Sequence, residues 1–361
     1  FDGSYFCNVL VKTREGRPIK IEGNPQSPIT KGGTSAQAQA SVVTLYDNKR
    51  LKGPIAKGAD TTWKELDQAV ARGISGSRGD VVMLTAPIMS PSTQSLIGQM
   101  QSRYPNFRVV TYEPVSQSGM LLANEESFGL KAIPSYHFDK AEVIVGVDCD
   151  FLGSWISPIE FSGDYIKTRK VDVNNPVMSQ HFQFEPSVSI TGAKADYRRS
   201  VKPSETGAVL VEIFKQLGGG VGASGATFDP LTAATIKKAV ASLRGAKGKS
   251  LVVCGSNNKD AQVVTNAINS LLNNMGYTID FGTTYNNYQG TDKEMAQLVS
   301  DMNAGRVGAI LINNVNPLLG KTKNMKPLFA SLFCKLTQKS AYKRVCKELL
   351  FWLYSMFKFF L

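Results

Sequence analysis

Apolar and polar positions along the chain follow two periods, which together predict an α/β fold. Short β-branched runs are typical of buried strands; they lie at 80–85, 107–112, 143–147, 249–254 and 308–312. Apolar residues at helical spacing predict helices between them, among them 63–74, 92–104, 206–217, 231–243 and 261–275. We expect Ser204 to cap the helix at 206–217. The strand-helix-strand order over residues 80–112 requires a parallel pair. We therefore expect a doubly wound parallel sheet flanked by helices.

The first residues follow a different pattern. Apolar and polar residues alternate over 9–24 around Glu15-Gly16, which predicts a β-hairpin whose turn uses Gly16. The pattern at 63–74 predicts a helix with Thr61 or Thr62 as its cap, and its apolar residues lie on one face: Trp63, Leu66, Ala69, Val70 and Ile74. We expect three segments: a small β-rich region at 1–60, an α/β domain at 61–320 and a tail at 321–361.

The net charge of +12 is concentrated in the tail. Residues 321–361 hold nine Lys or Arg against one acid, Glu348, so the rest of the chain is nearly neutral and a nucleic-acid groove is not expected. The basic, aromatic tail fits an interfacial membrane helix and is too short in its apolar part to span a bilayer. The competing hypothesis, which we favour, is that the tail is not native to this protein.

The five cysteines are Cys7, Cys149, Cys254, Cys334 and Cys346. None forms a C-x-x-C pair, which argues against a disulfide framework and against a zinc or iron-sulfur site. Cys149 and Cys254 end apolar runs and are expected to be small buried thiols.

Polar residues in or after the predicted strands are the candidate site residues. Asp148 and Asp150 follow the run at 143–147, where ligands bind in open α/β sheets, although they could equally cap the next turn. His181 lies in a probable strand, where a packed histidine is more common than a general base. The strand-turn-helix at 255–260, with Lys259, is a generic phosphate cradle.

A glycine-rich run at 218–225 contains a formal G-x-G-x-x-G at Gly220, Gly222 and Gly225. The motif binds a pyrophosphate only after a strand, and here it follows a helix. A flexible connection is therefore the better interpretation.

Several of these stretches resemble the molybdopterin oxidoreductases. Residues 151–161 and 187–196, with the hairpin at 9–24, are most similar to the molybdopterin-oxidoreductase-like iron-sulfur subunit of bacterial alternative complex III, a quinol:electron-acceptor oxidoreductase. The resemblance covers roughly residues 9–317. In the family this region wraps a bis-pterin dinucleotide. The corresponding cleft residues here would be Asp148, Asp150, Thr191, Asp196, Ser204, Glu205 and Asn316.

The chain departs from the catalytic members of this family in two places. They hold a four-iron cluster on four cysteines around the hairpin, whereas only Cys7 is near it here and residues 31–35 stand where the last cysteine would be. The molybdenum ligand comes from a region that offers only Glu113, Ser116 and Ser118, and loop serines are mostly turn formers. No catalytic set is visible, and we expect no cofactor in this chain.

The resemblance implies a structural, pterin-free module of a membrane-associated respiratory complex that oxidises quinol. Iron-sulfur clusters of a carboxyl-terminal domain outside this sequence would pass electrons to haem-bearing subunits, beside integral membrane subunits at the periplasmic face of the bacterial inner membrane. An export signal would precede Phe1. Two alternatives stay open: a catalytic molybdopterin-dependent oxidoreductase with a dinucleotide near Asp148, Asp196 and Ser204, and a phosphate- or nucleotide-binding enzyme using 255–260.

Overall fold

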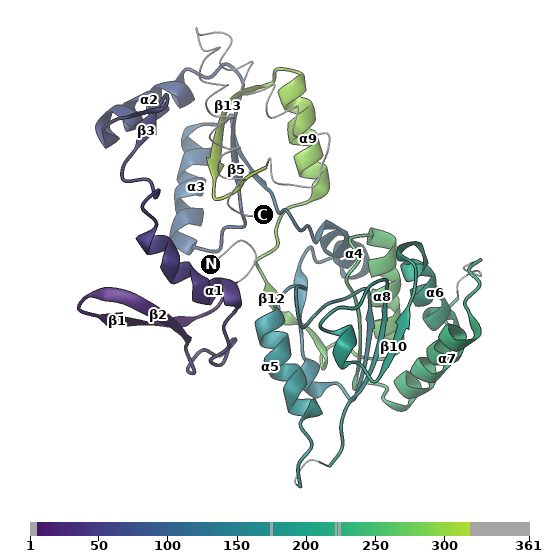
Figure 1. Ribbon diagram of the computed structural model, residues 1–361. Coiled ribbons are helices and arrows are strands. Elements are labelled where there is room, and N and C mark those ends of the chain that lie inside the picture. The colour runs from purple at the N-terminus through teal and green to yellow at the C-terminus, as the bar shows by residue number, and fades with distance from the viewer. Residues whose placement is uncertain (1–5, 174–175, 221, 223–224, 318–361) are drawn as a thin grey trace. The chain divides into compact units, whose positions relative to one another are not determined.

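The computed structural model describes residues 6–173, 176–220, 222 and 225–317 (Figure 1). The tail at 321–361 and part of the glycine run lie outside the described residues. Two compact units interleave along the chain: Phe1–Val43 with Ser116–Gln289, and Thr44–Val115 with Gly290–Leu361. The division into segments at 1–60, 61–320 and 321–361 stays a prediction.

The first unit is built on a four-stranded parallel sheet with the order β10-β9-β8-β11. The strands are β8 (Val143–Val147), β9 (Gln180–Glu185), β10 (Tyr197–Ser200) and β11 (Ser250–Cys254). The chain winds from β8 outward to β10 and then returns to the other side of β8. The predicted doubly wound parallel sheet is confirmed, and its strand order reverses between β8 and β11.

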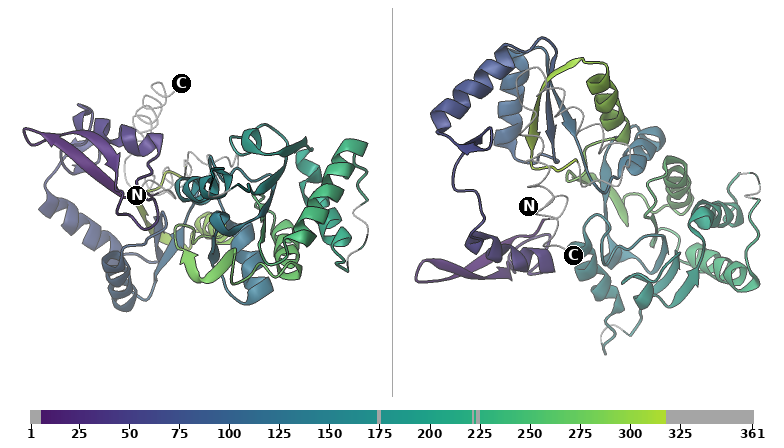
Figure 2. Two further views of the ribbon diagram at one scale, coloured as in Figure 1. Left: turned by 90° about the horizontal axis from the view of Figure 1, so that it is seen from below. Right: turned by 45° about the horizontal axis from the view of Figure 1, so that its top comes forward.

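Helices cover both faces of this sheet, as Figures 1 and 2 show. Side chains alternate along β8, so Val143, Val145 and Val147 pack with residues of three helices, while Ile144 packs on the opposite side. The first group comprises α6 (Thr206–Gln216), α7 (Pro230–Gly245) and α8 (Lys259–Leu271). The opposite face receives α4 (Ser118–Phe128) and α5 (Pro158–Arg169), together with the antiparallel pair β7 (Ile133–Tyr136) and β12 (Ile279–Tyr285). Each fully buried aliphatic side chain contributes about 1.5–3 kcal/mol.

Short elements connect these parts. They are α1 (Ala36–Ala40) and the 3₁₀ turns η1 (Ser41–Tyr46), η2 (Phe138–Lys140), η3 (Gly192–Lys194) and η4 (Pro203–Glu205). The predicted hairpin is confirmed as β1 (Val9–Arg14) and β2 (Arg17–Gly23), which pair antiparallel. Glu15 and Gly16 have φ values of 51° and 75°, so the turn has positive φ at both central positions, as a two-residue type I′ hairpin requires.

The second unit holds a separate three-stranded parallel sheet with the order β13-β5-β6. Its elements are β5 (Asp80–Thr85), α3 (Pro91–Arg103), β6 (Phe107–Thr111), α9 (Asp292–Asn303), β13 (Val307–Asn313), α2 (Trp63–Ser75) and the short pair β3 (Ile55–Ala56) and β4 (Ala59–Asp60). The parallel β5–β6 pair confirms the predicted crossover. The helix predicted at 63–74 is confirmed as α2 with Thr62 as its cap. Much of its apolar face is open, because Trp63 is 67% exposed and Val70 41% exposed, whereas Ile74 is buried.

Candidate functional site

The carboxyl edge of the four-stranded sheet brings some of the predicted site residues together. Asp148 and Asp150 follow β8, Thr191 lies in the loop after β9, and Ser204 and Glu205 follow β10. These loops meet at one edge because the strands are parallel.

Asp196 does not belong to this group. It directly precedes β10, and its carboxylate accepts the N–H of His181 near the start of β9. It therefore lies near the amino ends of these strands, about four residues along the sheet from Asp148. Asn316 follows β13 in the second unit. The seven predicted residues therefore do not all belong to one edge of one sheet.

Asp150 and Thr191 hold two loops together. The Asp150 Oδ1 accepts hydrogen bonds from the backbone N–H of Thr191 at 3.1 Å and from its hydroxyl at 2.8 Å. The same hydroxyl oxygen accepts the N–H of Leu152 at 2.9 Å. Thr191 is fully buried, so the contact replaces water on both partners. Asp150 thus joins the loop after β8 to the loop after β9, which is a contact between distant segments and not a local cap of the next turn.

Asp148 lies at the point where the strand order reverses. Its φ of 51° is left-handed, and its backbone N–H donates to the carbonyl of Phe184 at 2.7 Å. A Cβ on Gly255, at the end of β11, would lie 2.0 Å from the Asp148 carbonyl oxygen. The two neighbouring strand ends therefore touch through their backbones, at the point where the strand order reverses.

The Asp148 side chain is exposed and makes no hydrogen bond with the described residues. Desolvation by its surroundings and the negative charge of Glu185 raise the pKa of this carboxyl above its ordinary value. Asp148 is therefore the predicted carboxylate that stays open to solvent.

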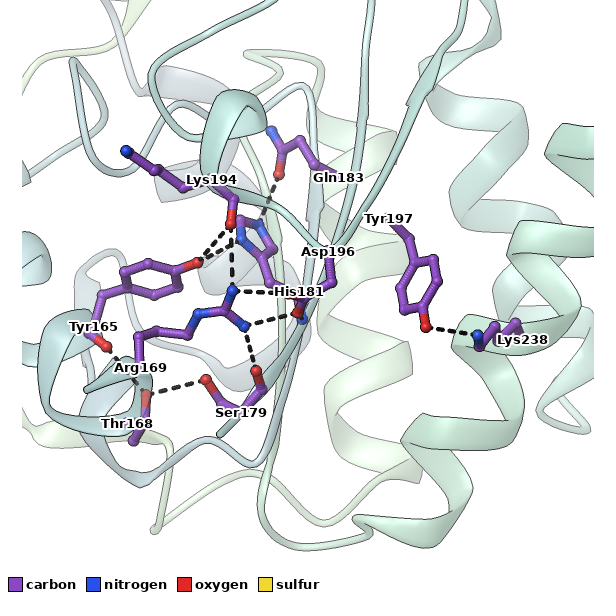
Figure 3. A network of polar contacts seen from close by, with 10 residues as sticks. All are labelled: Tyr165, Thr168, Arg169, Ser179, His181, Gln183, Lys194, Asp196, Tyr197 and Lys238. Carbon is purple, nitrogen blue, oxygen red and sulfur yellow. Dashed lines mark hydrogen bonds and ion pairs between the residues drawn. The ribbon is translucent and has the colours of Figure 1, made fainter. Parts of the chain in front are cut away.

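Asp196 is committed to Arg169 at the end of α5 (Figure 3). The guanidinium nitrogens lie 2.7 and 2.8 Å from the two carboxylate oxygens, the bidentate geometry that favours Arg over Lys. The N–H of His181 adds a third hydrogen bond at 2.8 Å. Burial acts to raise the pKa of Asp196, but these donors bring it below its ordinary value.

Ser204 is exposed within η4, and the prediction that it caps the helix after 206 is wrong. Pro203 starts a 3₁₀ turn ahead of α6, and in that turn the Glu205 carboxylate accepts from the N–H of Lys202 at 3.0 Å and its ammonium at 2.8 Å. Glu205 also lines a cavity of about 460 Å³, with Phe228 and Asp229. Asp229 is likewise occupied, because it caps α7.

The residues considered as molybdenum ligands form hydrogen bonds within the chain. The hydroxyl of Ser116 accepts the N–H of Ser118 at 3.1 Å, which is the turn-forming role expected of a loop serine. Glu113, in the second unit, is buried and accepts the N–H of Gly290 at 3.0 Å.

A line of buried polar side chains on β9 was missed by the sequence reasoning. His181, Gln183 and Glu185 alternate along the strand and are all almost fully buried. Polar residues at every second position of a strand flanked by Phe182 and Phe184 were the available signal. The partners come from distant segments and could not be inferred.

The hydrogen bonds along this line share one direction. Gln183 donates its amide hydrogens to the Cys149 carbonyl at 3.0 Å and to Glu185 at 3.2 Å, so its oxygen accepts from Nε2 of His181 at 3.3 Å. Nδ1 of His181 is then the acceptor for the Tyr165 hydroxyl at 3.0 Å (Figure 3). Each donor polarises the next, towards Glu185.

Glu185 is held as a carboxylate at the end of this line. Burial would raise its pKa, but hydrogen bonds from Ser189 and the ion pair with Arg198 at 2.6 Å lower it below the ordinary value. Burial has the opposite effect on a histidine and lowers the pKa of His181 to about 4, so its imidazole is neutral. The line fixes the loop after β9 and offers no acid-base pair to a substrate.

The predicted phosphate cradle at 255–260 is also occupied. Asn258 caps α8 by accepting the N–H of Ala261 at 2.9 Å, and Asn257 accepts the N–H of Gly119 at 2.7 Å. Lys259 forms an ion pair with Glu126. One N–H of the helix start is thus capped and the lysine charge is paired, which weakens the attraction of this helix start for an anion.

Residues 31–35, which stand where the family has its last cluster cysteine, pack against α5. Lys31 forms an ion pair with Asp164 of α5 at 3.2 Å, and a Cβ on Gly33 would lie 2.6 Å from the side chain of Ile159. Within the described ranges, no three His, Cys, Asp or Glu side chains gather as a metal site. Cys149 and Cys254 are buried thiols, as predicted, and burial raises the pKa of Cys254 to about 12.

Comparison with known proteins supports the resemblance. The chain is 26% identical over 157 residues to "menaquinone reductase, molybdopterin-binding-like subunit" of Nitratidesulfovibrio vulgaris, a match that covers 41% of this chain and 22% of the relative. This chain is molybdopterin-oxidoreductase-like. It is also 31% identical over 75 residues to "probable oxidoreductase YoaE" of Bacillus subtilis, covering 18% of this chain and 11% of that protein. The matches thus span about a fifth and a tenth of these relatives.

Two solved structures are similar at low identity to this molybdopterin-oxidoreductase-like chain. Acetylene hydratase from Pelobacter acetylenicus has a TM-score of 0.47 at 10% identity, covering 73% of this chain and 41% of its own. The formyltransferase/hydrolase complex from Methylorubrum extorquens has a TM-score of 0.39 at 10% identity, covering 79% and 65%. No protein-family model matches the chain.

Among the predicted cleft residues, Asp150, Thr191, Asp196 and Glu205 use their polar groups for contacts within the chain. A pterin dinucleotide would have to displace these contacts. The residues as arranged do not fit the role of its ligands.

Proposed function

We propose that this chain is a structural, pterin-free module of a membrane-associated respiratory complex that exchanges electrons with a quinone. The menaquinone reductase subunit supports the quinone link. The sequence resemblance to alternative complex III adds the finer proposal that quinol is oxidised and that electrons pass through iron-sulfur clusters outside this sequence to haem subunits. The name of the relative describes quinone reduction, so the direction of electron flow is part of the test.

The Asp150–Thr191 contact carries the pterin-free part of this proposal. It ties together the two loops that would have to open around a dinucleotide, and both partners are satisfied by each other. Breaking such a buried pair costs about 1–3 kcal/mol before a ligand gains anything. The backbone contact of Gly255 with Asp148 holds the start of the loop after β8 against the end of β11.

The two alternative functions have less support. A catalytic molybdopterin enzyme requires a metal ligand, and the hydroxyl of Ser116 already accepts a turn hydrogen bond. A phosphate-binding enzyme at 255–260 requires open amides and a lysine, but Asn258 caps the helix and Lys259 is paired with Glu126.

The proposal extends to place and partners. Haem-bearing and integral membrane subunits would surround the module at the periplasmic face of the bacterial inner membrane. Among the described residues, no helix has the length and apolar character to cross a bilayer, so membrane contact would come through the complex.

The test is the cofactor content of the complex purified from its own cells through a tag on this chain. Molybdenum is measured by mass spectrometry and pterin by fluorescence after oxidation, with a catalytic molybdopterin enzyme from the same cells as the positive control. We expect haem and iron in the preparation, and far less than one molybdenum or pterin per chain. Stoichiometric molybdenum and pterin would reject the pterin-free role. Assays with quinol and with quinone then give the direction of electron flow.

A further inference from the structure

The hairpin β1–β2 covers almost nothing of its own chain. It is a two-stranded sheet that is hydrogen-bonded to no other strand among the described residues. Of its side chains in the strands, only Ile21 is buried, at 7% exposure, and every β1 residue after Val9 is exposed. A two-stranded hairpin is marginally stable in water unless one face is covered.

The base of the hairpin is nevertheless fixed. The N–H of Asn24 donates to the Asn8 carbonyl at 3.0 Å, and the Asn8 amide donates to the hydroxyl of Ser27 at 3.1 Å. Gly23 lies directly against the backbone of Gly32, where a Cβ would be 1.8 Å from the carbonyl oxygen. A tight turn closes the other end. The hairpin is therefore a defined arm with an open outer part.

One face of this arm carries consecutive pairs of like charges. The register places Lys12 opposite Lys20 and Arg14 opposite Arg17. Like charges directly across a ladder destabilise it. Lys20 has an ion pair with Glu22 at 2.9 Å, whereas Lys12, Arg14 and Arg17 have no ion pair with any described residue. The fold thus maintains a repulsive basic ladder that an external anionic surface would relieve.

We propose that the basic face of this hairpin docks onto an acidic surface of a neighbouring protein subunit. Its chemistry fits such a partner, because three cations on this face, Lys12, Arg14 and Arg17, have no ion pair among the described residues and could bind Asp and Glu. Leu10, 51% exposed and opposite Glu22, adds an apolar contact on the same face. Charge complementarity of this kind sets the orientation and speed of docking. The inference rests on the proposed function in one respect, that the chain belongs to a complex.

Two other occupants fit less well. A second copy would bring one basic ladder against another. A lipid bilayer would favour apolar residues at the tip of the arm, but the tip holds Arg14, Glu15 and Arg17, and the apolar Leu10 and Val11 lie towards its base. Both occupants are outcomes of the experiment below.

The first measurement is zero-length cross-linking of the purified complex with a carbodiimide, which joins lysine amines only to carboxylates. We expect peptides that join Lys12 to an Asp or Glu of a different polypeptide. The second is the charge reversal Arg14→Glu with Arg17→Glu in the full chain. Recovery of that partner after a moderate-salt wash should fall about tenfold or more. The matched control, Lys237→Glu with Lys247→Glu, makes the same charge change at exposed lysines of α7 and the following turn and should leave recovery unchanged.

The outcomes separate the two proposals. If wild-type chain brings no stable partner, the proposed function fails and this inference fails with it. If the complex is intact but Lys12 yields no intermolecular cross-link and both double variants retain the partner equally, the docking inference alone is overturned. It is also overturned if the hairpin variant loses instead a concentration-dependent dimer, or loses flotation with phosphatidylglycerol vesicles. Circular dichroism of both variants checks that the chain is folded.

Discussion

Thr191 and Asp150 are 41 residues apart in the chain and are joined by two hydrogen bonds that fasten the loop after β9 to the loop after β8. The threonine hydroxyl takes part in two contacts, since it also accepts the N–H of Leu152. One buried hydroxyl therefore organises the edge of the sheet at which ligands bind in related architectures.

Replacing Thr191 by Val should destabilise the chain by about 1–3 kcal/mol, because the Leu152 N–H loses its acceptor in a buried site. Urea denaturation followed by circular dichroism measures the change. Thr191→Ser is the control, because it keeps the hydroxyl and should retain most of the stability. Equal losses in the two variants would mean that the methyl group, and not the hydrogen bonds, matters here.

The backbone contact between the ends of β8 and β11 can be tested with two glycine variants. Gly255→Ala places a Cβ 2.0 Å from the Asp148 carbonyl oxygen and should cost about 1–3 kcal/mol or more, because backbone atoms would have to move. Gly163→Ala, at an exposed position inside α5 with open space around it, should stabilise by about 0.5–1 kcal/mol. A Gly255→Ala chain with unchanged unfolding free energy would show that the two strand ends are not in contact.

His181 should make stability fall as the solution becomes acidic. Burial lowers its pKa from 6.5 to about 4, so between these values the unfolded chain binds a proton that the folded chain does not. Stability is complete above pH 6.5 and decreases towards pH 4 by roughly 3 kcal/mol. The measurement is the slope of unfolding free energy against pH in His181→Phe, which should be flatter in this window whatever its stability at neutral pH.

The lowered pKa values of Glu185 and Asp196 act in a separate window. Their carboxylates stabilise the fold above their unfolded values of 4.5 and 3.8, and this stabilisation is lost as the pH falls further. A wild-type chain whose stability is constant from pH 6.5 to 4.5 would contradict the prediction for His181.

Asp148→Asn should stabilise the fold, unlike most substitutions. The pKa of Asp148 is raised by desolvation and by Glu185, so its ionisation disfavours the fold once the pH is above the unfolded value of 3.8. The variant should gain up to about 1 kcal/mol at pH 7, limited by solvent screening, and the gain should vanish at a pH where Asp148 is protonated. Asn also tolerates the left-handed backbone. A loss of stability at pH 7 would argue for an unseen favourable role of this charge.

The elements that could be predicted are those with local causes. β8 was predicted with its observed limits because a β-branched run needs no distant information, and the hairpin was predicted because Glu15-Gly16 specifies its turn. The exposure of the apolar face of α2 could not be predicted. Helical periodicity shows which face is apolar, but it does not show whether another element covers that face, and Trp63 is exposed.

The candidate site could be predicted only as positions along the chain. Asp150 was selected as a carboxylate after a strand and Asp196 through the family resemblance. Their partners, Thr191 and Arg169, are fixed by packing between loops and helices. The Ser204 cap failed because the 3₁₀ turn at Pro203 shifts the start of the helix. Long-range pairing of this kind is not encoded in local patterns.

The ion pair of Lys31 with Asp164 has a consequence for the order in which the protein is made. The two residues are 133 positions apart. At ordinary rates of synthesis, Asp164 leaves the ribosome roughly seven to twenty-seven seconds after Lys31. During that interval the segment around Lys31 has no α5 to pack on, so the hairpin that precedes it belongs to a nascent chain whose later contacts are not yet made.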